Sequence, residues 1–115
     1  MSNLHLPMHD YEYEWIGDKR FTVCTMRQIV THTIGMDSKD TYTRNGKKYY
    51  KPYRNHFNTR LGEHPWPELE AAGYAAHGKV YVRDNGNTKM TDYYMTRKGL
   101  DWMGEELGII IRDER

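Results

Sequence analysis

The sequence predicts a single α+β domain, because two kinds of periodicity alternate along its 115 residues. Segments in which rings and polar residues alternate around Gly-Asp or Asn-Gly pairs predict antiparallel hairpins. Segments in which apolar residues recur every three or four positions, between Thr or Pro and a following Gly, predict helices. One domain, residues 1–115, is expected because this length forms one modest core and the chain contains no internal repeat.

The expected core is rich in aromatic rings and Met. Ile, Val, Leu and Phe number only 18, a proportion below the level at which disorder becomes a concern. Ten Tyr and three Trp compensate for this shortage, and a net charge of +1 avoids the repulsion typical of disordered chains. The composition therefore predicts a folded domain.

The first predicted element is an N-terminal hairpin. The segment YEYEWIGDKRFTV alternates on both sides of Gly17-Asp18, which predicts strands at 11–16 and 20–24. We assign residues 1–24 to this hairpin as an extension of the domain core.

Residues 26–34 are predicted to form a helix. Thr25, followed by Gln28, matches a capping box, and apolar residues then recur at helical spacing up to Gly35. Residues 37–48 lack periodicity and contain an Asn-Gly turn signal, so they are expected to form a loop or a small hairpin.

A second helix is predicted over residues 52–61. Pro52 suits the first turn of a helix, where its missing N–H leaves no bond unmade. Tyr53 and Phe57 begin a repeat of apolar residues every fourth position, and Gly62 follows it.

The second half of the chain predicts a short helix, a hairpin, a final helix and a candidate last strand. In chain order these elements span 67–73, 79–82 with 93–96, 97–107 and 108–115. Asn85-Gly86 supplies the turn at the polar tip of the hairpin, and Thr96 caps the final helix.

This order of elements resembles a winged helix-turn-helix domain. The similarity is sharpest over residues 66–107, which resemble bacterial regulators of the MarR and PadR type. The matching residues in WPELEAAGYA and YYMTRKGLDWM are Leu69, Glu70, Gly73, Tyr74, Tyr93, Thr96 and Gly99. The chain is also similar to small proteins of phage and prophage genomes.

The resemblance implies a winged-helix core over residues 25–107 and a phage or bacterial transcription regulator that binds DNA. It also implies a homodimer, because such regulators read two half-sites. Gly62, Pro65 and Pro67 interrupt the segment where the family has a continuous recognition helix. A DNA-reading helix is therefore expected at 52–61.

Charge is concentrated in the middle of the chain. Residues 41–60 carry six Lys/Arg and no acid, whereas residues 1–40 and 61–115 have net charges of −2 and −3. Cations interleaved with rings are typical of nucleic-acid contact, since phosphates attract the cations and bases stack on the rings. The candidate contacts are Arg44, Lys47, Lys48, Lys51, Arg54, Asn55, Asn58, Arg60 and, on the wing, Lys89. The alternative interpretation is that the rings belong to the core and the cations to a solvated surface.

The motifs of catalysis and of metal or cofactor binding are absent from the sequence. Six His show no metal-ligand spacing, and there is no nucleophile elbow or Gly-rich phosphate loop. We therefore expect neither an enzyme nor a bound cofactor. The single Cys24, the lack of a signal-like segment and the lack of an apolar run near ~20 residues predict a cytoplasmic protein without a membrane span.

A second class of function stays open. The near-zero net charge and the acidic termini favour a protein-interaction module, such as a phage-encoded inhibitor that keeps the scaffold without binding DNA. Its partner would be a host or phage protein. The regulator predicts that the cations of residues 44–60 converge on one surface with the wing. The module predicts that they are dispersed or covered by Glu and Asp.

Overall fold

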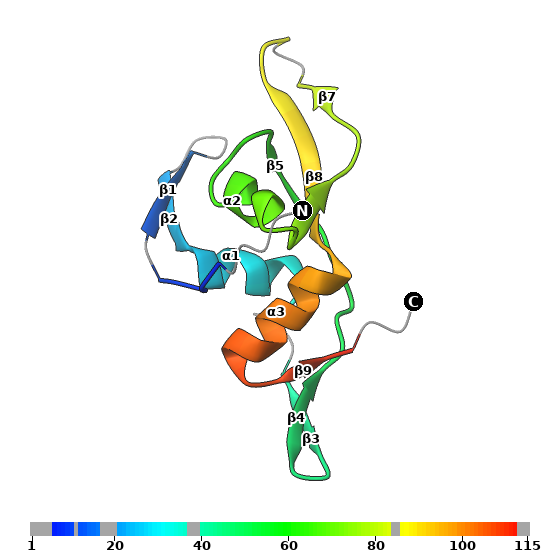
Figure 1. Cartoon of the computed structure of the whole chain (residues 1–115). Helices are drawn as coiled ribbons and strands as arrows, with labels where there is room; N and C mark the ends of the chain where they lie inside the picture. The colour runs from blue at the N-terminus through cyan, green and yellow to red at the C-terminus, as the bar shows by residue number, and fades with distance from the viewer. Residues whose placement is uncertain (1–5, 11, 17–20, 37–39, 84–85, 113–115) are drawn as a thin grey trace.

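The computed structural model describes residues 6–10, 12–16, 21–36, 40–83 and 86–112. These residues form a mixed α+β structure with three helices (Figure 1). None of the three is long and apolar enough to cross a membrane. The predicted turn at Gly17-Asp18, and Asn85 of the second predicted turn, lie outside the described residues.

The helices are separated by short strands. They are α1 (Met26–Thr33), α2 (Trp66–Ala71) and α3 (Arg97–Leu107). The strands are β1 (Glu12–Ile16), β2 (Phe21–Thr25), β3 (Tyr42–Arg44), β4 (Lys47–Tyr50), β5 (Phe57–Arg60), β6 (Ala75–His77), β7 (Tyr81–Val82), β8 (Lys89–Met95) and β9 (Ile110–Ile111).

The strands are joined in three groups. β1 pairs with β2, β3 and β4 are extended by β9, and β5, β6 and β7 all pair with β8. All of these pairs are antiparallel except β4 with β9. The β7–β8 hairpin and the β3–β4 hairpin lie at opposite ends of the molecule, with the helices between them (Figure 1).

Local signals account for the boundaries of α1 and α3. The Thr25 hydroxyl accepts a hydrogen bond from the Gln28 amide, and the Gln28 side chain accepts one from the Thr25 amide, so the predicted capping box is confirmed. The Thr96 hydroxyl accepts from the Gly99 amide at 3.0 Å, as expected for the cap of α3. Gly108, with φ 70°, ends that helix.

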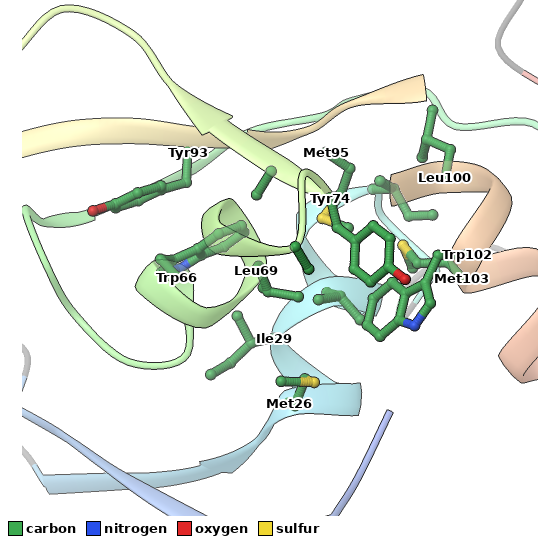
Figure 2. Close-up of a cluster of buried hydrophobic side chains, with 14 of the residues drawn as sticks. Met26, Ile29, Trp66, Leu69, Tyr74, Tyr93, Met95, Leu100, Trp102 and Met103 are labelled. Atoms are coloured by element: carbon green, nitrogen blue, oxygen red, sulfur yellow. The ribbon is translucent and has the colours of Figure 1, made fainter. Parts of the chain in front are cut away.

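The core is aromatic and Met-rich, as the composition predicts. Trp66 stacks on Tyr93 with ring centroids 4.8 Å apart, and Tyr74 stacks on Trp102 at 4.6 Å (Figure 2). Leucines and methionines from all three helices and β8 surround the rings. The buried members of this set are Met26, Leu69, Met95, Leu100 and Met103.

Four of the residues that carry the resemblance, Gly73, Tyr74, Thr96 and Gly99, meet at one junction. The Thr96 hydroxyl donates a 2.7 Å hydrogen bond to the carbonyl oxygen of Gly73, just after α2. A Cβ atom added at Gly99 would lie 1.9 Å from the carbonyl oxygen of Tyr74. These positions therefore let α3 pack directly on the backbone that follows α2.

The predicted helix over residues 52–61 is wrong. Residues 57–60 form β5, in which buried Thr59 lies beside exposed Asn58 with the period of a strand. The reason is a long-range contact: the Asn55 side chain bonds both the amide and the carbonyl of Met95, at 2.8 Å each. Pairing with β8 therefore overrides the local helical spacing.

The elements after α2 agree with the prediction in part. The predicted hairpin of residues 79–82 and 93–96 is found as β7 and β8, the predicted final helix is α3, and β6 was not predicted. β8 begins at Lys89, four residues before the predicted start of this strand. No helix lies between α1 and α2 in the described residues 40–65, so one helix of the expected order is missing.

Candidate nucleic-acid interface

The β3–β4 hairpin is the part of the basic segment that projects from the body (Figure 1). Its two-residue turn holds Asn45 and Gly46, with φ 53° and φ 76°, as in a type I′ turn. Such a turn matches the twist of the two strands and sets Arg44 directly opposite Lys47. Of the two alternatives predicted for residues 37–48, the small hairpin is the one that forms in the described part.

The hairpin has two faces of different character. Side chains of directly opposed residues lie on the same face, so one face carries a pair of rings and a pair of cations. We call this the outer hairpin face; its residues are Tyr42, Arg44, Lys47 and Tyr49. On the other face, Tyr50 is buried and donates a 2.9 Å hydrogen bond to the Ile34 carbonyl oxygen. Tyr50 thus anchors the hairpin and leaves the outer hairpin face uncovered.

The two cations of the outer hairpin face lie directly opposite each other. Arg44 and Lys47 are both exposed, and neither forms an ion pair within the described part of the chain. Like charges directly opposed across two strands destabilise the pairing. Lys48, on the other face, and Lys51, just after β4, are also exposed. A chain of phosphates would relieve this repulsion.

Arg54 has a different environment, at the end of α1. Its guanidinium donates to the His32 carbonyl oxygen from Nη2 at 2.7 Å and from Nε at 3.1 Å, and lies 5.5 Å from the centre of the Tyr53 ring. The last carbonyl groups of a helix lack partners within the helix. Arg54 therefore serves to complete α1 in this structure.

The two asparagines connect strands. Asn55 fixes the end of β8 through the bonds to Met95 described above. The Asn58 amide donates to the Tyr81 hydroxyl at 2.8 Å and to the Asp92 carboxylate at 3.0 Å. Both side chains are engaged with the β8 sheet and lie away from the hairpin.

Arg60 and Lys89 come together at the base of the β7–β8 hairpin. Arg60 donates from Nη2 to both carboxylate oxygens of Glu63, at 2.9 and 3.1 Å. An open hollow of about 360 Å³ lies beside them, lined by Arg60, Leu61, Asn87, Thr88 and Lys89. Glu63 compensates the charge of Arg60, so this hollow is less positive than its cations suggest.

The predicted contact residues are therefore divided between the two ends of the molecule. Arg44, Lys47, Lys48 and Lys51 lie at the β3–β4 end, whereas Arg60 and Lys89 lie at the wing end (Figure 1). The cations of residues 44–60 do not converge with the wing. This dispersal, with Glu63 covering Arg60, is the arrangement expected of the protein-interaction module.

Other titratable groups gather around Tyr93. Burial raises the pKa of the Tyr93 hydroxyl above its ordinary value of 10.0, the hydrogen bond from the Gly62 amide opposes this shift, and the nearby Glu70 and Glu63 carboxylates add to it. Glu70 also contacts His77 Nδ1 at 2.7 Å. Among the described residues, no group of three or more His, Cys, Asp or Glu side chains is arranged to hold a metal ion.

Comparison with known proteins finds no matching family model, no matching curated protein and no matching solved structure. We therefore base the function on the geometry of the outer hairpin face.

The predicted contact residues omit both rings of this face, Tyr42 and Tyr49. The Tyr42 ring stacks on that of Tyr49, with centroids 5.7 Å apart and an interplanar angle of 17°. The signal was the Asn45-Gly46 turn, because a two-residue type I′ turn at that position fixes Tyr42 opposite Tyr49.

Proposed function

We propose that this protein binds nucleic acid through the outer hairpin face and the lysines beside it. The observation that carries the proposal is the opposed pair of Arg44 and Lys47, two exposed like charges that form no ion pair with an acid of the described residues. Because two opposed like charges weaken the hairpin, the stability of the fold does not explain why Arg44 and Lys47 are placed opposite each other. Attraction of both cations to phosphate would explain their placement.

The proposal retains a winged-helix scaffold in which a hairpin replaces the recognition helix. Its support is the order α2, β6, β7–β8 and α3. The helix expected before α2 is absent from the described residues 40–65, which counts against this scaffold. α2 is short and carries Glu68 and Glu70, whose carboxylates would repel DNA phosphates, so it is poorly suited to bind in a major groove. Exposed cations on a projecting hairpin instead suit contact with the phosphates of either duplex or single-stranded nucleic acid. A cytoplasmic, homodimeric regulator of transcription is the biological role that the resemblance adds.

The test is fluorescence anisotropy of labelled random duplex and single-stranded DNA at low and high salt. The double variant R44A/K47A is compared with K79A/K98A, which removes the same charge from two exposed lysines outside the hairpin. We expect salt-dependent binding whose slope falls by about 1.8 for R44A/K47A on duplex DNA, since each phosphate contact contributes about 0.9. Equal binding of the two variants would place the interface elsewhere.

The second candidate is the protein-interaction module. The observation that favours it is the dispersal of the cations, with Arg60 held by Glu63 and Arg54 held by the end of α1. Absence of binding to any nucleic acid at low salt would select this candidate. A pull-down with the wild-type chain, compared with a variant altered in the exposed residues Val80 and Val82 of the wing, would then be the next experiment.

A further inference from the structure

We infer that the outer hairpin face binds unpaired nucleotides, with the Tyr42 ring as the platform on which a base stacks. Arg44 and Lys47 would then contact the adjoining phosphates. This inference rests on the proposed function and narrows it from nucleic acid in general to single strands.

The first observation is the position of the ring pair. Tyr42 and Tyr49 are stacked, and Tyr42 keeps 44% of its surface exposed. The other closely stacked pairs of the described residues, Trp66 with Tyr93 and Tyr74 with Trp102, lie in the core. Tyr49 thus covers one face of the Tyr42 ring, and the other face is available for stacking with a planar group such as a base.

The second observation is the distance between the rings and the cations. Arg44 is two residues beyond Tyr42 on the same face, which is about 7 Å along a strand. A single nucleotide spans this distance from its base to its phosphate. A base stacked on Tyr42 would therefore bring phosphate to Arg44 and Lys47, and both halves of the nucleotide would be bound at once.

The Tyr42 ring, unlike the cations, favours single strands over a duplex. In a duplex, the faces of the bases are covered by neighbouring base pairs, so an exposed ring has no base to stack on. Unpaired bases offer their faces, and stacking on aromatic side chains tolerates any base sequence. Cations alone would bind duplex and single strand alike, so the Tyr42 ring supplies the preference.

The experiment compares three labelled probes of equal length at one salt concentration. They are an oligothymidylate, an abasic oligodeoxynucleotide with the same phosphates, and a duplex. The wild-type chain is expected to bind the oligothymidylate at least about fivefold more tightly than the abasic strand, because stacking of one base contributes that factor or more. Equal affinity for the oligothymidylate and the abasic strand would overturn the inference and leave the proposed function intact.

Variants of Tyr42 test whether its ring causes the preference for the oligothymidylate over the abasic strand. Y42L removes the π face and keeps an apolar side chain, and Y42F keeps the ring. The matched control is Y94L, because Tyr94 on β8 is similarly exposed at 41%. We expect Y42L to lose the preference for bases and Y42F and Y94L to keep it. Retention of the preference by a Y42L chain with unchanged circular dichroism would contradict the inference. Absence of binding to all three probes would contradict both it and the proposed function.

Discussion

Reversing one charge on the outer hairpin face should change stability and binding in opposite directions. Lys47 lies directly opposite Arg44, and both side chains are exposed. K47E converts a repulsive cross-strand pair into an attractive one. The same change removes a phosphate contact and introduces a carboxylate that repels nucleic acid.

The size of the stability gain follows from the geometry. An opposite-charge pair across two antiparallel strands contributes roughly 0.2–1 kcal/mol. Because both groups face water and salt, we take the middle of that range, a gain of about 0.5 kcal/mol in the free energy of unfolding. For a chain of this length, the gain corresponds to a rise of about 2 °C in Tm. Tyr50 links the hairpin to the core, so the gain is expected to register in global unfolding.

Urea denaturation and thermal melts measure the stability of K47E, and anisotropy measures its binding. The control is K79E, which makes the same change of charge at an exposed lysine outside any strand and should not gain stability. A lower Tm for K47E would refute the account of the hairpin pairing. A more stable K47E that binds like the wild type would refute the role of the outer hairpin face.

Three further changes test the fold away from the hairpin. N55A should cost about 1–3 kcal/mol in urea unfolding, because it leaves the amide and carbonyl of Met95 without partners, while binding by the folded chain stays unchanged. G99A should cost about 3 kcal/mol or more by thermal melts, since its Cβ would overlap the Tyr74 carbonyl oxygen. The raised pKa of Tyr93 means that the folded chain keeps this proton after the unfolded chain has lost it. Stability should therefore decline above about pH 10, and Y93F should show a smaller decline between about pH 9 and pH 11 in urea titrations.

The elements that the sequence predicted well are those specified by neighbouring residues. α1 depends on the capping box of Thr25 and Gln28, and α3 depends on Thr96 before the helix and Gly108 after it. The β3–β4 hairpin, one of the two forms expected for residues 37–48, depends on its Asn-Gly turn. Each of these signals lies within four residues of the element that it defines.

The prediction of a helix at residues 52–61 was wrong because distant residues, and not neighbouring ones, determine the structure of this segment. The apolar spacing there suits a helix, but the segment is held by β8, with Phe57 opposite Tyr93 and Asn55 bonded to Met95. Such contacts join residues about forty positions apart, so no pattern within the segment itself indicates them. The candidate site divides for the same reason, since a count of cations along the chain does not show that β5 carries Arg60 away from the hairpin.

Because Tyr50 alone anchors the β3–β4 hairpin, the hairpin sequence is free to change during evolution. Only this residue of the hairpin is buried, so the others are released from the demands of core packing. Substitutions at residues 42–49 can accumulate without refolding the domain, provided that the Asn-Gly turn is kept. A hairpin of different sequence could then be grafted onto the same body, which would give it a new target at the cost of a few mutations.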